Sequence, residues 1–441
     1  MSTPGAPFTR RPLSGPPPDR LFELKTRTHQ RLLSRLSVEA LKKISREGLR
    51  GEVGGLVERM VADENLPITL TERDRLVEEI LDEVFGLGPL EPLLKDPTIS
   101  DILVNGPNQV YVERGGKLSP TNVRFADNRH LMHIIEKIVS SIGRRIDEST
   151  PLVDARLADG SRVNAIIPPL AIDGPSISIR RFGRKVVSND DMIRNLTLTR
   201  GMLEVLGACV EGRLNIVVSG GTGSGKTTFL NALSRFLPEH ERVITIEDTA
   251  ELQLQIPDVV RFETRPANIE GKGQITQRQL LATALRMRPD RILLGEARGA
   301  EALDMLQAMS TGVEGSMTTI HANTPQDAFA RMETMVMMAK LDLPSRFIRQ
   351  QMASNINLVV QTARLSDGSR RIAQVSEVIG LSGSDLQLQD VFVFEKTGVG
   401  ENGRVQGRFR GLGTPPRFAE RLRLHGIRLA PKLFEENTPV V

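Results

Sequence analysis

The chain of 441 residues is long enough for two or three domains, and an apolar content of 39% supports ordinary globular cores. Its formal net charge of +4 is small for this length and its aromatic content is 4%, so the composition does not favour the stacking surfaces of a nucleic-acid-binding protein. Cys209 is the single cysteine, which excludes disulfides and cysteine-based zinc sites within one chain and fits a reducing compartment.

The first part of the chain is rich in proline. Residues 1–20 hold six prolines, so we predict a disordered tail there. Arg10 and Arg11 have no apolar segment behind them, and no run of about 18 apolar residues occurs in the sequence. We therefore expect a cytoplasmic protein without a secretory signal or a membrane span.

Residues 21–85 change to a helical pattern. Apolar residues recur at steps of three and four, first between Leu32 and Ile44 and again between Leu76 and Val84. Thr71–Asp74 resembles a capping signal before the second run. The pattern predicts an N-terminal helical bundle with a solvated outer face, and a docking surface for a partner is the alternative.

Gly86–Pro92 is a boundary rich in Gly and Pro, and after it the apolar period falls to two. Alternating residues on both sides of Asn105–Gly106 predict a hairpin, and Asp127 is placed to cap a helix. Residues 86–184 are therefore predicted to form a compact α/β domain.

Four arginines stand in or beside the predicted strands of this domain, namely Arg156, Arg162, Arg180 and Arg181. Surface strands often carry arginine without any catalytic role. The alternative is that these arginines offer positive charge to the phosphates of a nucleotide on an adjacent subunit. Because side chains alternate along a strand, Arg180 and Arg181 are expected to point to opposite faces, so at most one of them would reach a given nucleotide.

The stretch Val217–Leu230 contains the pattern G-x-x-x-x-G-K-[ST] between an apolar strand and a helix. Its glycines let backbone N–H groups turn toward an anion, and the helix N-terminus adds partial positive charge. Lys226 is expected to reach the β- and γ-phosphates of ATP, and Thr227 to hold Mg²⁺. A flexible glycine linker is the alternative, which the flanking elements disfavour. The predicted nucleotide-binding residues are Gly220, Gly221, Thr222, Gly223, Ser224, Gly225, Lys226, Thr227 and Thr228.

Three further short segments are typical of strands that end in polar residues. A β-branched run ends in Glu247 and Asp248, Glu296 follows an apolar strand, and His321 ends a third short strand. The carboxyl ends of parallel strands meet at the edge where ligands bind, so Glu247 and Glu296 are candidates for placing Mg²⁺ or polarising the attacking water. Each acid taken alone also fits a helix cap or a loop. We interpret His321 as a sensor of the γ-phosphate.

Four motifs coincide in order: Ser219–Thr228, Thr245–Asp248, Ile292–Gly299 and Thr318–Thr324. Together they resemble the motifs of the type II/type IV secretion ATPase superfamily. The stretches 154–165, 178–182, 285–291 and 299–308 are similar to its CpaF branch, the motor of tight-adherence (Flp) pilus assembly. The likeness runs from about residue 86 to the end of the chain.

The resemblance implies an α/β architecture of three parts: the helical bundle, a PAS-like domain at residues 86–184 and a RecA-like P-loop ATPase domain at 199–397. A linker at 185–198 and a C-terminal tail at 398–441 complete the predicted division. ATP would bind at the cleft between the PAS-like and RecA-like domains.

The resemblance also implies roles for single residues. The acid of the family's Asp box matches Glu247, its Walker B acid matches Glu296, and its His box ends at His321. Its arginine fingers match Arg162 and Arg180 best, with Arg156 and Arg181 as second choices. Val313 departs from the pattern, because many relatives carry His directly after the Thr-Gly of the His box.

We therefore expect a homo-hexameric ATPase that uses ATP and Mg²⁺. It would power pilus assembly or retraction, or type II/IV secretion, at the cytoplasmic face of the inner membrane. Its partners would be membrane platform proteins, with peripheral membrane association and without nucleic acid. Two alternatives stay open: a RecA-like nucleic-acid translocase of a conjugation-type system, which the pI of 9.3 allows, and a regulatory nucleotide-binding subunit without turnover.

Overall fold

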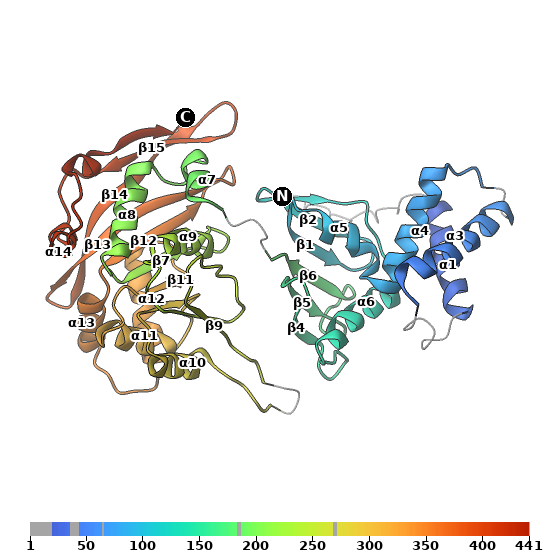
Figure 1. Cartoon of the computed structure of the whole chain (residues 1–441), viewed down its shortest axis with the longest axis horizontal. Coiled ribbons are helices and arrows are strands. Elements are labelled where there is room, and N and C mark those ends of the chain that lie inside the picture. The colour runs from blue at the N-terminus through green and yellow to red at the C-terminus, as the bar shows by residue number, and fades with distance from the viewer. Residues whose placement is uncertain (1–19, 36–43, 64–65, 183–186, 268–270, 441) are drawn as a thin grey trace, which may run out of the picture. The chain divides into compact units, whose positions relative to one another are not determined.

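The computed structural model describes residues 20–35, 44–63, 66–182, 187–267 and 271–440, and the chain divides into two compact units, Met1–Phe182 and Gly183–Val441 (Figure 1). The tail predicted for residues 1–20 lies outside the described residues, except for Arg20 at the start of the first helix. Within the described ranges, no helix combines the length and the hydropathy needed to cross a bilayer.

The first unit begins with the helices α1 (Arg20–Arg35), α3 (Arg46–Asp63) and α4 (Leu70–Phe85). Apolar side chains from all three, including Leu24, Val53 and Ile80, form one buried cluster, which confirms the predicted helical N-terminal region. The predicted cap of α4 at Thr71–Asp74 is wrong by two residues. Thr69 is the N-cap, and its side chain and that of Glu72 bind each other's backbone N–H groups in a capping box.

The rest of the first unit is an antiparallel sheet with the strand order β3-β2-β1-β6-β5-β4. Apolar residues at alternate strand positions pack with α6 on one face, which leaves polar residues on the other face. As predicted, Asp127 caps α6, because its carboxylate accepts the N–H of His130 at 2.8 Å. The elements are η1 (Gly88–Leu90), α5 (Glu91–Lys95), β1 (Ile99–Asn105), β2 (Val110–Arg114), β3 (Lys117–Pro120), α6 (Asn128–Ser141), β4 (Leu152–Arg156), β5 (Arg162–Ile166) and β6 (Ser176–Arg180).

A buried carboxylate joins the helical bundle to this sheet domain. The side chain of Glu83, at the end of α4, is 2% exposed and lies 3.0 Å from Nζ of Lys25 on α1 and 2.9 Å from Nε2 of His130 on α6. Burial alone would raise the pKa of Glu83, but the hydrogen bond with His130 and the charge of Lys25 lower it to about 2. The bundle is therefore attached through an ionised group.

Replacing Glu83 with alanine is expected to lower the free energy of unfolding by about 3 kcal/mol, because Lys25 is left buried without this partner. The carboxylate's contribution is present above its ordinary pKa of 4.5 and is lost as the pH falls toward 2. Denaturant unfolding of the full chain at several pH values measures both effects. Glu79→Ala is the control, since Glu79 is 32% exposed and lies 3.8 Å from the same lysine. Equal losses of unfolding free energy in Glu83→Ala and Glu79→Ala would contradict the stabilising role assigned to the buried Glu83.

The second unit is built on a ten-stranded sheet whose parallel half has the order β9-β8-β10-β11-β7-β12. Its strands are β7 (Ile216–Gly220), β8 (Val243–Glu247), β9 (Val259–Glu263), β10 (Arg291–Leu294), β11 (Met317–Ile320) and β12 (Leu358–Arg364). The helices and 3₁₀ turns that accompany them are α8 (Arg200–Glu211), α9 (Lys226–Leu233), η2 (Ser234–Phe236), α10 (Gln277–Ala284), η3 (Leu285–Met287), α11 (Glu301–Ser310), α12 (Pro325–Met337) and α13 (Ser345–Asn355).

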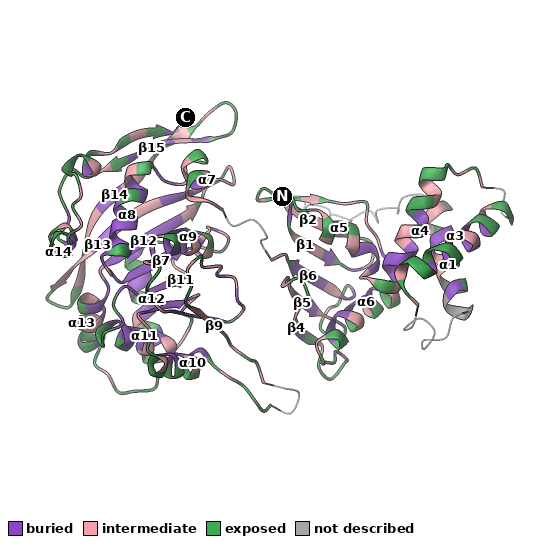
Figure 2. Cartoon of the chain, in the orientation of Figure 1, coloured by how far each residue is buried: buried purple, intermediate pink, exposed green. Residues whose placement is uncertain are grey.

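Helices cover both faces of this parallel half. Side chains of α8 and α9 pack on one face, and side chains of α10 to α13 pack on the other. Every residue of β7, β8, β10 and β11 is consequently buried (Figure 2), which explains why these strands are dominated by apolar and β-branched residues and do not alternate with exposed polar ones. The arrangement confirms the predicted α/β class with a RecA-like ATPase domain, and it brings the carboxyl ends of the strands to one edge.

An antiparallel half extends the sheet beyond β12. It consists of β13 (Arg370–Ser382), β14 (Asp385–Val399), β15 (Val405–Gly411) and β16 (Asn437–Val440), with α14 (Phe418–Leu424) and η4 (Pro431–Glu435) beside it. The sequence divides residues 398–441 off as a tail, but the described part, 398–440, belongs to the second unit, since it contributes strands to this sheet and its Phe409, Phe418 and Phe434 lie in the same core as β7. Within the predicted linker, α7 (Asn189–Arg194) buries Met192 in that core. The other predicted domain boundaries stay predictions.

Candidate functional site

The predicted phosphate-binding loop joins the end of β7 to the start of α9. Gly223 and Gly225 have φ angles of 70° and 97°, which glycine adopts far more easily than other residues. Gly225 directly precedes the helix, so the first N–H groups of α9 and its partial positive charge are available to an anion. Thr227 and Thr228 lie in the first turn of this helix. The loop therefore has the backbone geometry of a phosphate site.

Close packing at Gly220 gives a direct test of the loop. A Cβ atom there would lie 2.2 Å from Oγ1 of Thr362 and 2.5 Å from Oγ of Ser224, whereas a Cβ atom at Gly221 would meet nothing within 4 Å. We expect Gly220→Ala to weaken nucleotide binding at least about tenfold, because the loop must shift to admit the methyl group. Gly398→Ala is a control outside the loop, because a Cβ atom at Gly398 would also meet nothing within 4 Å, and it should bind like the wild type. Titration with a fluorescent ATP analogue measures both, and equal affinities would contradict the prediction.

Two residues that the sequence did not single out support the loop from β12 and β13. Oγ1 of Thr362 lies 2.7 Å from Oγ of Ser224, and Nε of Arg370 donates a hydrogen bond of 3.0 Å to the carbonyl of Gly223. Both supporting residues lie more than a hundred positions after the loop in the sequence. No local motif marks them, and only the parallel pairing of β12 with β7 brings them near.

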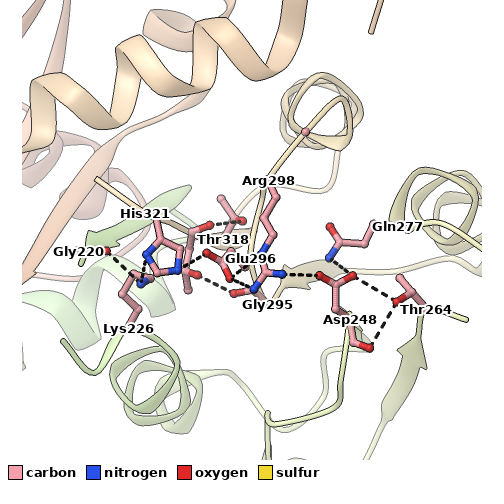
Figure 3. A network of polar contacts seen from close by, with 12 residues as sticks. Gly220, Lys226, Asp248, Thr264, Gln277, Gly295, Glu296, Arg298, Thr318 and His321 are labelled. Atoms are coloured by element: carbon pink, nitrogen blue, oxygen red, sulfur yellow. Dashed lines mark hydrogen bonds and ion pairs between the residues drawn. The ribbon is translucent and has the colours of Figure 1, made fainter. Parts of the chain in front are cut away.

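The lysine of the loop contacts the histidine at the end of β11 (Figure 3). Nζ of Lys226 donates hydrogen bonds to the carbonyls of Gly220 and Gly221, at 3.0 and 3.1 Å, and lies 3.3 Å from Nδ1 of His321. Burial lowers the pKa of His321, and the charge of Lys226 lowers it further, while Glu296 opposes them. A neutral His321 with its proton on Nε2 fits these neighbours, because Nδ1 can then accept from the lysine.

Glu296 stands just after β10 and is in the middle of the polar network of Figure 3. Its Oε1 lies 2.7 Å from Nε2 of His321, and its Oε2 accepts hydrogen bonds from Nη2 and Nε of Arg298 at 2.7 and 2.9 Å. The side chain is 16% exposed. Arg298 and His321 also line a cavity of about 510 Å³, whose other lining residues lie mainly on α12. The two side chains that contact Glu296 therefore border this cavity.

Glu247, at the end of β8, is oriented differently. Its carboxylate accepts hydrogen bonds from the backbone N–H groups of Glu251 and Leu252 at 2.8 and 3.0 Å, and it is buried. Burial raises the pKa of Glu247 to about 7, although these hydrogen bonds act in the opposite direction. The structure therefore brings Lys226, His321 and Glu296 together and holds Glu247 in its own backbone turn.

The chemistry of these residues fits a nucleotide-bound Mg²⁺ better than a protein-only metal site. Among the described residues, no three or more His, Cys, Asp or Glu side chains form a group that could hold a metal. Mg²⁺ usually takes one or two protein ligands together with phosphate oxygens and water. The hydroxyl of Thr227 at the helix start and the carboxylate of Glu296 are the side chains here that suit this role.

The predicted arginines of the first unit divide between two surroundings. Arg162 lies directly opposite both Arg156 and Arg180 in the strand register, so these three share one face of the sheet. Nε of Arg180 lies 3.5 Å from the carboxylate of Asp101. Asp101 lies opposite Arg180 in the register and supplies one negative charge, which leaves the row with a surplus of positive charge.

Arg181 points away from this row, as the two-residue period predicts. Its Nη1 donates hydrogen bonds to the carbonyls of Asp96 and of Ile99, the latter at 3.1 Å. These contacts hold the start of β1, so the surroundings of Arg181 are structural.

The family model described as type II/IV secretion system protein matches residues 83–408, and that of the type II secretion system protein E N-terminal domain matches residues 21–85. A Mycobacterium tuberculosis protein named for conjugal transfer is 37% identical over 300 residues, which are 67% of this chain and 85% of the relative. The type IV secretion system protein VirB11 of Brucella suis is 33% identical over 324 residues, 67% and 89% of the two chains. A crystal structure of the Brucella suis VirB11 ATPase with sulphate is 31% identical, covers 68% of this chain and 96% of its own, and has a TM-score of 0.36.

Proposed function

The chain belongs to the type II/IV secretion system protein family and is an ATP hydrolase, and on this premise we propose that it is the motor of a pilus or secretion apparatus. In this proposal the protein forms a homo-hexamer at the cytoplasmic face of the inner membrane. It acts there on a membrane platform protein, as members of the CpaF branch do. One observation carries it: the loop lysine, His321 and Glu296 meet at the ends of three neighbouring strands.

The proposed chemistry assigns a task to each of these groups. The N–H groups of the loop and Lys226 bind the β- and γ-phosphates, and Thr227 would hold Mg²⁺, which would supply further positive charge to the phosphates. Glu296 orients the attacking water and accepts its proton. His321 lies between Lys226 and Glu296, so it responds when a γ-phosphate draws the lysine away.

The arginine row on the first unit's sheet is proposed to supply the remaining positive charge to a nucleotide. We expect Arg162→Ala and Arg180→Ala each to lower ATP turnover roughly a hundredfold, the usual cost of removing one charge-stabilising donor, without lowering the melting temperature. Arg181→Ala is the control, and it should lower the melting temperature because Arg181 holds the start of β1. Phosphate release measures ATP turnover and thermal unfolding measures stability, so together they distinguish the arginines of the row from the structural Arg181. Wild-type turnover in both row variants would reject the assignment.

A second candidate function is a nucleic-acid translocase, which the Mycobacterium tuberculosis relative's name favours. ATP turnover measured with a solubilised platform protein, with single-stranded DNA and with duplex DNA separates the candidates. The motor proposal predicts stimulation by the platform protein alone. Strong stimulation by DNA that falls steeply as salt is raised would favour the translocase instead. Sedimentation of the protein with an ATP analogue tests the proposed hexamer.

A further inference from the structure

The connection between β9 and α10 extends away from the sheet of the second unit (Figure 1). We name its described residues, 264–267 and 271–276, the β9–α10 arm. Its two sides are held together by backbone hydrogen bonds from Arg265 N to Ile275 O, at 3.0 Å, and from Ile275 N to Arg265 O, at 2.8 Å. The arm is therefore a paired structure with a defined base.

One carboxylate at the end of β8 holds both sides of this base. Oδ1 of Asp248 accepts hydrogen bonds from Oγ1 of Thr264 at 3.2 Å and from Nε2 of Gln277 at 3.0 Å. Thr264 follows β9, and Gln277 is the first residue of α10 and is buried. Asp248 consequently connects the two sides of the arm at its base.

Arg298 links this carboxylate to that of Glu296 (Figure 3). Its Nη1 lies 3.4 Å from Oδ2 of Asp248, while Nη2 and Nε bind Oε2 of Glu296. A guanidinium presents its donors in a planar fork and can hold two carboxylates at once, which a lysine cannot do in this geometry. The backbone N–H groups of Arg298 and Gly299 bind the carboxylate of Glu301 at 2.6 and 2.7 Å, so the loop that carries the arginine is anchored.

The carboxylate of Glu296 is held from two sides, by His321 and by Arg298. Oε1 of Glu296 faces His321, which in turn contacts the loop lysine. Lys226 is the proposed phosphate ligand, so phosphates are expected to act on this side of the carboxylate. On the other side, Oε2 is bound to Arg298, which links it to Asp248 at the base of the arm.

We propose that Asp248 and Arg298 are positioning residues that hold Glu296 in its working orientation and transmit displacements of the β9–α10 arm to it. The proposal rests on the proposed role of Glu296 in ATP hydrolysis. Asp248 contacts the base of the arm and Arg298, whereas Arg298 contacts the carboxylates of Asp248 and Glu296. None of these interactions involves the phosphate loop. Their loss is therefore expected to lower kcat and to leave the KM for ATP nearly unchanged.

Steady-state ATP turnover of the full chain tests the positioning role. Arg298→Ala should lower kcat about tenfold or more while KM stays within about twofold, and Arg298→Lys should recover only part of kcat. Arg278→Ala is the matched control, because Arg278 forms an ion pair of 2.6 Å with Asp304 outside the network. A wild-type kcat in Arg298→Ala, or a raised KM with unchanged kcat, would overturn the proposal.

Two further measurements test the coupling to the arm. The effects of Arg298→Ala and Asp248→Asn on kcat should be less than additive in free energy, and full additivity would overturn the relay. Hydrogen exchange of arm peptides without nucleotide should be faster in Arg298→Ala than in Arg278→Ala, and equal exchange would also overturn it. Hydrogen exchange does not require ATP turnover. If the wild type did not hydrolyse ATP, the proposed function would be rejected, and the exchange rates would still test the coupling between Arg298 and the arm.

Discussion

Replacing Glu296 with glutamine is expected to give a protein that binds ATP and scarcely hydrolyses it. Glutamine keeps the size of the side chain and an oxygen that can accept from Arg298, but it cannot take a proton from water. Loss of a general base costs about 10²- to 10⁴-fold in rate. Because Lys226 and the phosphate loop are untouched, ATP affinity should be equal to or higher than that of the wild type. Single-turnover phosphate release and nucleotide titration measure the two quantities.

The chain offers a matched control for this substitution. Glu333, on α12, is 12% exposed and accepts a 3.0 Å contact from Nε of Arg349, so it resembles Glu296 in burial and in its arginine partner. Glu333→Gln should hydrolyse ATP at the wild-type rate. If Glu296→Gln also did so, Glu296 would lose its proposed role and the second strand-terminal acid, Glu247, would have to be examined.

Much of the parallel half of the sheet could be predicted from sequence, for a physical reason. Strands covered on both faces consist of continuous apolar residues, and the polar residue after each run marks the edge where ligands bind. Glu296 and His321 were placed at the site by this pattern, and the structure brings them within 2.7 Å of each other. The glycines of the loop were recognised because a phosphate cradle needs their backbone freedom.

Other features depend on contacts between distant segments, which no local pattern encodes. Glu247 follows its strand just as Glu296 does, yet its carboxylate folds onto the N–H groups of Glu251 and Leu252. Arg298 was visible as part of a motif, but its pairing with Asp248 depends on the neighbouring ends of β8 and β10. The resemblance implies a separate tail from residue 398 onward, whereas Phe409, Phe418 and Phe434 place the described part of this segment in the core of the second unit.

Replacing Lys226 with alanine is expected to have the other large effect, a loss of ATP turnover of about a hundredfold or more together with weakened ATP binding. The ammonium group lies at the carbonyls of Gly220 and Gly221, within the phosphate loop itself, so its positive charge is held at the predicted phosphate site. Alanine removes this charge from the phosphates and also the contact that reports on them to His321.

Lys226 is 8% exposed and donates a hydrogen bond to the carbonyl of Gly220 in its own loop, so its loss can also lower stability. Stability and ATP turnover are therefore measured separately. Lys396→Ala, which removes an exposed lysine from β14, is the control for the loss of one positive charge. Thermal unfolding of both variants without nucleotide shows whether the fold survives. If Lys226→Ala melts like Lys396→Ala but gains no thermal stability from ATP, the lysine binds phosphate. If ATP stabilises it as strongly as the wild type, phosphate recognition belongs to the backbone N–H groups alone, and Lys226 acts only on the hydrolysis step.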